Sequence, residues 1–390
     1  MSKAAELAAL IGSQTALTNR NLIINGAMQV AQRGTSGTIA ANDGAAYKSI
    51  DRWQLSNALD VTATIAQSST APAGFTNSLK ITVGGADDLS GSYDAFQVQQ
   101  HIEAQNLQHL KYGTSSALSL TLSFWVRSSV TGTYVTHLYQ SDGNDLISGS
   151  YTIDSADTWE YKTITYAGNT AAAPANDNGQ GLRVTFMLGA ATEYTSGTLP
   201  TAWEAYTDAD SAAGQTANVA SSASGEWYLT GVQLEVGEQA TPFEHRSMGD
   251  ELARCQRYFF NPMAGGNGQS SQISFHSMLN MGGSVSTGNN GHIAFHVPFP
   301  VSMRAAPSLT HDIDNDKIVT SAPSGTEVAF YIQNQGYRPK AGNGNLNTLS
   351  RATGTSAGCL VGTYYISPDN LKGDQINIGA SNQFHFSAEL

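Results

Sequence analysis

The stretch that decides the fold is W-Y-L-T-G-V-Q-L-E-V-G-E-Q-A-T-P-F-E-H-R-S-M-G-D-E-L-A-R-C-Q-R-Y-F-F, residues 227–260. Residues 227–236 alternate their side chains between two faces, which is typical of a β-strand. Ser247 then stands three residues before Asp250, as in a capping box, and this spacing predicts a short helix over 247–258. The stretch therefore closes one β-rich domain, forms a helix and begins a second β-rich domain.

One face of the predicted helix carries four residues at steps of four, three and four: Met248, Leu252, Cys255 and Phe259. This spacing matches the seam of a short coiled coil. Because the apolar stripe is narrow and its flanks are polar, the sequence predicts a parallel homotrimer with this helix near the threefold axis. The alternative is a linker helix packed against its own domain. A helix this short cannot hold three chains together without the flanking domains.

Alternating patterns recur upstream of this stretch, and the clearest is 118–127, in which apolar residues occupy every second position. Residues 34–44 are expected to form a loop. The other expected strands are 22–28, 51–55, 61–65, 79–83, 96–102, 134–139, 159–166 and 182–188. The first and last strands both look central, which favours a jelly roll over a simple meander.

Short β patterns also follow the helix, and they predict a second, smaller β-sandwich. These strands are expected at 272–279, 292–297, 308–311, 327–333, 358–365, 375–378 and 383–389. The predicted fold class is all-β, with a short N-terminal helix, a jelly-roll β-sandwich, a short helix and the second sandwich. The predicted parts are 1–18 (helix or tail), 19–240 (jelly roll), 241–258 (junction turn and helix) and 259–390 (C-terminal sandwich).

The composition excludes several classes of protein. Charged residues make up 13% of the 390 residues, against about 25% in ordinary soluble domains. The net charge of −12 disfavours nucleic acid and anionic membranes as partners. No apolar run approaches the ~18 residues of a membrane span, so no membrane insertion is expected. Two cysteines, Cys255 and Cys359, make a disulfide framework improbable.

Two patterns resemble metal sites, and neither predicts one. His292 and His296 lie in a strand-like segment, where residues four apart stand ~13 Å from each other, too far to share a metal. Asp312, Asp314 and Asp316 resemble the start of a calcium loop, but the glycine and the final glutamate are missing. A solvated acidic turn is the favoured interpretation, with calcium as the alternative. No cofactor is expected.

No catalytic constellation stands at a strand-to-turn position, so no enzyme activity is expected. Aromatic residues can form a stacking platform for sugars, although they more often lie in a core. Trp53 and Trp159 are expected to be core residues. Trp125 lies on the polar face of its strand and is the candidate glycan contact.

Three stretches resemble bacteriophage tail-fibre and other virion appendage proteins, notably those of marine phages. The first is V-Q-L-E-V-G-E-Q-A-T-P-F-E-H-R-S-M-G-D-E-L-A-R-C-Q-R-Y-F-F, residues 232–260. The second is N-R-N-L-I-I-N-G-A-M-Q-V-A-Q-R-G, residues 19–34, followed by D-R-W at 51–53. The third is F-P-V-S-M-R-A-A-P-S-L-T, residues 299–310. The region that the second stretch opens also resembles jelly-roll carbohydrate-binding modules.

This resemblance implies a structural virion protein, a tail-fibre or appendage subunit that contributes to host-surface attachment. It also implies location in the virion after assembly in the host cytoplasm, and it points to a trimer. The alternatives are a glycan-binding attachment module without a structural role and, less favoured, a glycan depolymerase.

The N-terminal residues 2–11 are expected to form a helix with one apolar stripe. Ala4, Leu7, Ala8 and Ile11 make up that stripe. A helix of this length is marginal alone and must dock on something. We expect it to anchor the chain to other virion tail proteins; the alternative is a frayed tail.

Overall fold

The structure is a computed structural model that describes residues 19–261, 271–276, 291–310, 318–319, 329–333, 350–355, 358–366, 375–380 and 385–390. The chain divides into two compact units, Met1–Leu252 with Leu390, and Ala253–Glu389. The predicted N-terminal helix, with Ala4, Leu7, Ala8 and Ile11, lies outside the described residues.

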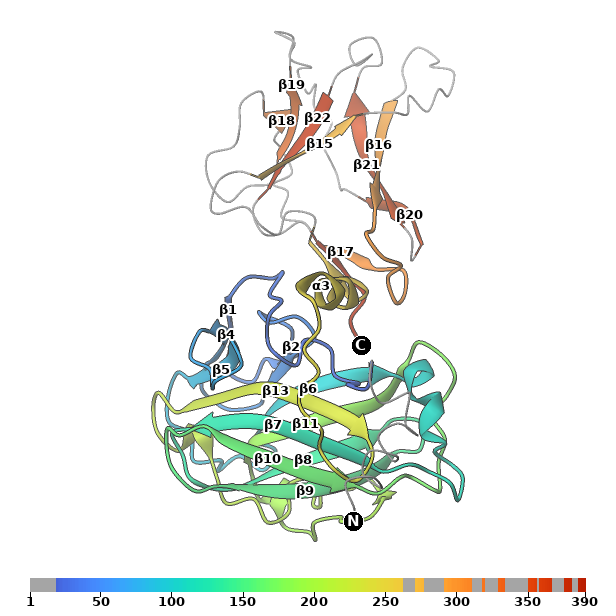
Figure 1. Cartoon of the computed structure of the whole chain (residues 1–390). Helices are drawn as coiled ribbons and strands as arrows, with labels where there is room; N and C mark the ends of the chain where they lie inside the picture. Colours follow the sequence, from blue (N-terminus) through green and yellow to red (C-terminus); the bar gives the residue numbers. More distant parts are fainter. Residues whose placement is uncertain are drawn as a thin grey trace. The chain divides into compact units, whose positions relative to one another are not determined.

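The first unit is an all-β jelly roll made of two stacked antiparallel sheets (Figure 1). Sheet A has the order β1 (Ser36–Ile39), β4 (Ala63–Ser68), β5 (Ser78–Val83), β13 (Glu226–Val236), β7 (Leu120–Ser128), β10 (Glu160–Tyr166). Sheet B has the order β12 (Glu204–Ala205), β9 (Asp145–Ile153), β8 (Gly132–Gln140), β11 (Gln180–Ala190), β6 (Ala95–Glu103), β3 (Gln54–Asn57), β2 (Gly44–Ala46). The short helices are η2 (Ala104–Leu110), α2 (Thr192–Thr195) and η3 (Val219–Ser221). The closing strand β13 lies between β5 and β7, as expected for a jelly roll.

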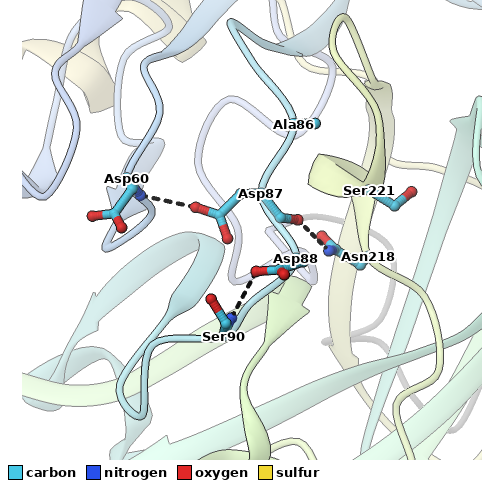
Figure 2. Close-up of a pocket in the computed structure, with 7 residues that line it drawn as sticks. All are labelled: Asp60, Ala86, Asp87, Asp88, Ser90, Asn218 and Ser221. Atoms are coloured by element: carbon cyan, nitrogen blue, oxygen red, sulfur yellow. Dashed lines mark hydrogen bonds between the residues drawn. The ribbon is translucent and has the colours of Figure 1, made fainter.

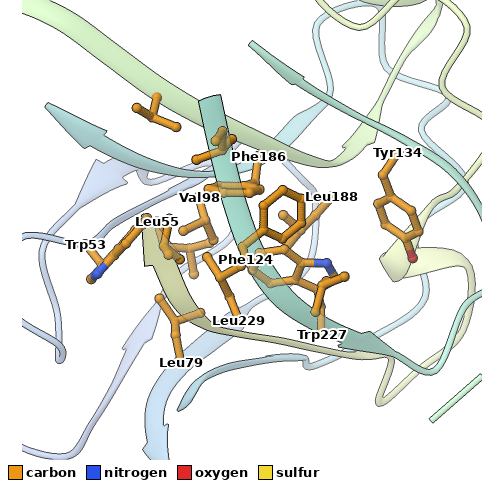
Figure 3. Close-up of a cluster of buried hydrophobic side chains, with 14 of the residues drawn as sticks. Trp53, Leu55, Leu79, Val98, Phe124, Tyr134, Phe186, Leu188, Trp227 and Leu229 are labelled. Carbon is orange, nitrogen blue, oxygen red and sulfur yellow. The ribbon is translucent and has the colours of Figure 1, made fainter. Parts of the chain in front are cut away.

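The core lies between the two sheets, because each strand turns its alternate apolar residues inward. Phe124 of sheet A meets Phe186 of sheet B edge-on, with ring centroids 5.0 Å apart. Trp227 of sheet A lies 5.9 Å from the same ring and is fully buried. Trp53 is also fully buried, so its assignment to the core is confirmed (Figure 3).

Two expectations for the jelly roll were wrong, and one strand was not predicted. Residues 22–28 form no strand, because Asn25 and Met28 have positive φ angles of 59° and 57°, which residues other than glycine do not adopt in a regular strand. The expected loop 34–44 contains strand β1, which pairs with β4. Strand β9 had no prediction, because its apolar residues are interrupted by Ser148, Gly149 and Ser150.

The stretch 19–34 is held by buried asparagine side chains instead of by a strand ladder. The Asn25 amide donates to Val30 O and Asp51 O, and its carbonyl accepts from Val30 N, at 2.8–3.0 Å. Trp53 Nε1 donates to the backbone carbonyl of Asn25 at 3.1 Å. Asn21 reaches across to β13, where its amide donates to Val232 O. These contacts explain the N-x-x-x-N spacing of this stretch.

The stretch that follows β13 lies against residues 19–25, more than 200 positions earlier in the chain. The Glu244 carboxylate accepts from the backbone N–H groups of Asn19 and Asn21. Arg246 donates to the carbonyls of Asn21 and Ile23. Glu251 accepts from Asn25 N. Two of the stretches that carry the resemblance, residues 19–34 and 232–260, are therefore hydrogen-bonded to each other, and these contacts stabilise the fold.

The junction helix is α3 (Met248–Gln256), somewhat shorter than expected. Ser247 Oγ accepts from Asp250 N at 3.1 Å and bonds the Asp250 carboxylate, so the predicted cap is confirmed. On the predicted seam, Met248 is 52% exposed and Leu252 is half-buried. Cys255 and Phe259 are buried by this chain itself, so their burial requires no partner chain.

The second unit contains short strands in three small sheets. Their orders are β14 (Phe259–Phe260), β23 (His385–Ser387), β17 (Ser308–Thr310); β15 (Ser271–His276), β22 (Gln375–Ala380), β19 (Ala329–Gln333), β18 (Ile318–Val319); and β16 (Gly291–Pro298), β21 (Gly358–Ile366), β20 (Ser350–Thr355).

The third resembling stretch helps to build the base of this unit. Phe299 packs on Phe386 with centroids 5.0 Å apart. Arg304 donates to the carbonyls of Ala388 and Glu389 at 2.8 and 3.0 Å. β16 is a strand, as expected for His292 and His296, whereas Asp312, Asp314 and Asp316 lie outside the described residues.

Candidate functional site

The outward surface of sheet B, which we name the polar face, carries polar residues in register across neighbouring strands. Gln99 of β6 pairs with Thr185 of β11, Thr185 with His137 of β8, and His137 with Ser148 of β9. One step along the strands, Arg183 of β11 lies between His101 of β6 and Tyr139 of β8. The strands place these side chains outward because their neighbours, such as Val184 and Phe186, fill the core.

Several of these side chains are buried and have one polar atom without a hydrogen-bond partner among the described residues. Thr185, His137, Ser148 and His101 are at most 8% exposed. On the polar face, five buried polar atoms lack a hydrogen-bond partner within the described part of the chain: Thr185 Oγ1, His137 Nε2, Ser148 Oγ, His101 Nε2 and Arg183 Nε. Leaving a buried polar atom unsatisfied costs about 1–3 kcal/mol. Such a concentration on one surface indicates a place where water or a ligand completes the bonding.

The hydrogen bonds of the two histidines determine which ring nitrogen carries the proton. His137 Nδ1 lies 3.0 Å from Ser211 O, and His101 Nδ1 lies 3.1 Å from Leu390 O. A carbonyl oxygen only accepts, so each Nδ1 carries the proton. Burial, followed by the charge of Arg183, lowers the pKa of His137 to about 3. Burial, then Arg183 and Arg52, lowers the pKa of His101 to about 3 as well. Both rings are neutral at pH 7, and each Nε2 is an acceptor.

Aromatic rings and a loop border the polar face. The Arg183 guanidinium lies 4.7 Å from the centre of the Tyr139 ring. Tyr206 meets Tyr139 edge-on at 5.4 Å. Gln215 Oε1 accepts from Val135 N at 3.0 Å. Through these contacts the loop 206–217 lies along one side of the polar face.

This set of groups suits a hydroxyl-rich ligand. The imidazole Nε2 atoms of His137 and His101 are closed to solvent, whereas the partly exposed Arg183 can donate an N–H to the oxygen of a sugar hydroxyl. Tyr139 and Tyr206 offer ring surfaces to the apolar faces of a sugar. Neither the Thr185 nor the Ser148 hydroxyl is hydrogen-bonded to a histidine.

The lowered histidine pKa values predict how stability depends on pH. Below about pH 6.5, His101 and His137 become protonated in the unfolded chain but stay neutral in the folded chain. The free energy of unfolding therefore falls as the pH drops toward 3. Each histidine contributes up to about 1.4 kcal/mol per pH unit in this window. Denaturant unfolding at pH 7, 5.5 and 4.5 measures the slope. His137→Asn, whose amide replaces Nδ1, should show a shallower slope; an unchanged slope would contradict the assignment.

Trp125, the candidate from the sequence, lies on the outward surface of sheet A, whereas the polar face belongs to sheet B. Its ring is half-buried and lies 5.3 Å from that of Tyr161, which is 45% exposed. The nearby charges are paired, with Arg127 bonded to Asp157 at 2.9 Å. This surface offers stacking. The role of Trp125 in glycan contact stays a prediction.

Trp159 was expected in the core, and that expectation was wrong. It precedes β10, is half-buried, and packs edge-on against Tyr228 with ring centroids 6.1 Å apart. The reason is that the residue lies just outside the strand, where inward alternation no longer applies.

A pocket of about 640 Å³ opens between the loops that carry Asp60, Asp87 and Asp88 (Figure 2). Both Asp87 carboxylate oxygens accept from backbone, from Asp60 N and Leu89 N, at 2.9 and 2.8 Å. Asp88 accepts from Ser90 N. These carboxylates brace loops, and no group of three or more metal-ligating residues among those described could hold an ion.

The described residues contain no helix that is both long and apolar enough to span a membrane.

Sequence reasoning did not single out the residues of the polar face. The pattern L-R-V-T-F places Arg183 and Thr185 outward, which is recoverable from alternation alone. Their burial was not recoverable, because the loop 206–217 that borders them comes from a distant part of the chain.

Neither a protein-family profile nor a curated protein sequence matches the chain. Among solved structures, it is similar to the enzymatically active domain of bacteriophage CBA120 tailspike protein 4, with 14% identity, a TM-score of 0.31, and coverage of 56% of this chain and 21% of that one. It is also similar to a putative sugar binding protein from Bacteroides thetaiotaomicron, with 13% identity, a TM-score of 0.33, and coverage of 56% and 100%.

A third similar structure is the family 11 carbohydrate-binding module from Clostridium thermocellum, with 12% identity, a TM-score of 0.27, and coverage of 54% and 98%. All three TM-scores are below 0.5, so no property of these proteins carries over to this chain.

Proposed function

We propose that this chain is a structural subunit of a phage tail fibre or appendage, and that its jelly roll attaches to host-surface glycans without catalysis. The observation that carries glycan binding is a group of partly exposed side chains at the border of the polar face: the Arg183 guanidinium lies 4.7 Å from the centre of the Tyr139 ring, and Tyr206 meets that ring edge-on. Such rings offer stacking surface to the apolar faces of a sugar. The virion role rests on the three resembling stretches and is the finer part of the proposal.

Glycan binding is tested with the full chain on an array of bacterial surface glycans. We expect binding by the native chain and at least a tenfold loss for Tyr139→Ala, which removes a partly exposed ring of the polar face. Tyr161→Ala is the matched control, because Tyr161 is an exposed ring of β10 in sheet A and should retain binding within twofold. Equal binding by both variants would place the glycan site elsewhere.

The rival function, a glycan depolymerase, makes a different prediction. Prolonged incubation of the chain with each bound polysaccharide should release no reducing ends. A release that grows with time and with protein concentration would replace attachment by cleavage.

The trimer remains a proposal centred on Met248 and Leu252, the two seam residues that this chain leaves at least partly exposed. Leu252→Asp would place a charge at the seam and cost several kcal/mol per copy if the helix lies near the axis. We expect a trimer for the native chain and dissociation for the variant, measured by mass in solution. A native monomer, or a variant trimer as stable as the native one, would contradict this arrangement.

A further inference from the structure

The segment 191–217 follows β11, includes α2 and β12, and lies against the outward surface of sheet B; we name it the strap. Two of the hydrogen bonds that hold it there run from Ser148 N to Pro200 O, at 2.7 Å, and from His137 Nδ1 to Ser211 O, at 3.0 Å. His137 and Ser211 are 2% and 3% exposed, so the second of these bonds is closed to solvent. The strap therefore contributes to the burial of the polar residues of sheet B.

The apolar part of the contact between the strap and sheet B is small. It consists of Val135, Met187 and Ala212, with Ala190, Tyr194 and Leu199 packed beside them. The core between the two sheets is a separate and far larger cluster. Two buried atoms that lack a partner among the described residues, His137 Nε2 and Ser148 Oγ, belong to residues that the strap contacts. A segment with few apolar contacts and unsatisfied polar atoms opens at a lower cost in free energy than a core strand, so the strap can detach while the core stays packed.

His137 responds to pH because its ring accepts a second proton much less readily under the strap than in water. Nδ1 already carries the proton that is donated to Ser211 O, so a second proton must bind Nε2. Nε2 is closed to solvent and has no acceptor among the described residues, so a cationic ring there lacks both water and a hydrogen bond. Burial, followed by the charge of Arg183, accordingly lowers the pKa of His137 to about 3. A ring that meets water titrates at its ordinary pKa of about 6.5.

The charged groups around His137 do not reverse this preference. The other titratable groups on this side of sheet B are Arg183 of β11, His101 of β6, Tyr139 of β8, and Glu193, Tyr194, Glu204, Tyr206, Asp208 and Asp210 of the strap, while β9 presents Ser148. Glu193, Glu204 and Asp208 are exposed, so water screens their charges. Asp210 accepts hydrogen bonds from Thr198 N, at 2.7 Å, and from the Thr207 hydroxyl. Arg183 is the charge that acts on His137, and it opposes protonation.

We infer that the strap is a pH-dependent cover: protonation of His137 at Nε2 releases residues 191–217 from sheet B while the core between the sheets stays folded. This inference goes beyond the proposed glycan binding and does not rest on it. Because the open form binds the proton more tightly, the open population rises as the pH falls below about 6.5. Between pH 7 and 4.5 the rise is expected to be roughly 50- to 100-fold, since the covered ring stays neutral down to about pH 3.

Hydrogen exchange of the full chain, corrected for intrinsic exchange rates, measures this opening. The reporters are the backbone amides of Thr216 and Ala217, which donate from the strap to Thr133 O at 3.0 and 3.1 Å. At pH 7 we expect them to be less protected, by about tenfold or more, than the amides that join β7 and β13 in sheet A. At pH 4.5 we expect their protection to be lower than at pH 7 by roughly 50- to 100-fold.

Two variants separate His137 from the other groups that titrate in this range. His137→Asn cannot take up a proton, and its amide can donate to Ser211 O, so the protection of the reporters should change less than about threefold between the two pH values. His101→Asn is the matched control, because His101 is also buried and has a lowered pKa but bonds Leu390 O instead of the strap. This control should keep the full loss of protection.

Equal protection of the strap reporters and the sheet A amides at pH 7 would show that the strap opens only when the whole jelly roll unfolds, and would overturn the inference. A loss of less than about fivefold in the native chain between pH 7 and 4.5, or the same loss in both variants, would overturn it as well. The measurements on the native chain decide the matter even if a variant fails to fold.

Discussion

Replacement of Trp227 by alanine is expected to lower the free energy of unfolding of the jelly roll by about 3–5 kcal/mol. Trp227 is fully buried in β13 and packs on Phe186 of the opposite sheet. Removing the indole leaves a cavity between the two sheets that rigid strands cannot close. A loss of this size would lower the melting temperature by on the order of 10 °C.

Tryptophan fluorescence during denaturant unfolding measures this effect, because all five tryptophans of the chain lie in residues 53–227. Trp159→Ala is the control, since Trp159 is half-buried at the end of a strand and should cost about 1 kcal/mol or less. If the two variants lose equal stability, the assignment of Trp227 to the core between the sheets is wrong.

Asn25→Ala is expected to cost about 3–5 kcal/mol, although it removes only a small polar side chain. The change deletes three buried hydrogen bonds to Val30 and Asp51 and leaves their backbone groups unsatisfied. Asn25 also has a φ of 59°, where alanine costs about 1 kcal/mol more than glycine. Asn25→Gly should therefore be less destabilising than Asn25→Ala by about that amount.

Denaturant unfolding of both variants measures the two contributions separately. Asn42→Ala is the matched control, because Asn42 also has a positive φ, 53°, but is exposed. We expect it to cost about 1–2 kcal/mol, mainly backbone strain. A loss in Asn25→Gly no larger than that in Asn42→Ala would show that the buried hydrogen bonds contribute little.

The sequence alone determined the β-rich class, most of the strands and the junction helix. Where one face of a strand is buried, apolar residues must alternate, and residues 118–127 display this directly. In 227–236 the expected regular alternation was wrong, because a β-bulge between Thr230 and Gln233 shifts it, so that Trp227 and Leu229 lie in the core together with Val232 and Leu234. The cap at Ser247 was also readable, because capping is an interaction between residues three apart. These features depend on neighbours in the chain.

Only the tertiary structure decided what residues 19–34 do and where the polar face lies. Asn25 adopts a positive φ because it bonds Val30 and Asp51, and its backbone bonds Glu251, so the apolar run 22–28 does not become a strand. Arg183 is half-buried because it lies between β6 and β8 and against Tyr139, which Tyr206 of a remote loop contacts. Both outcomes come from contacts between residues tens to hundreds of positions apart, and local periodicity contains no information about which distant segment will cover an outward-facing residue.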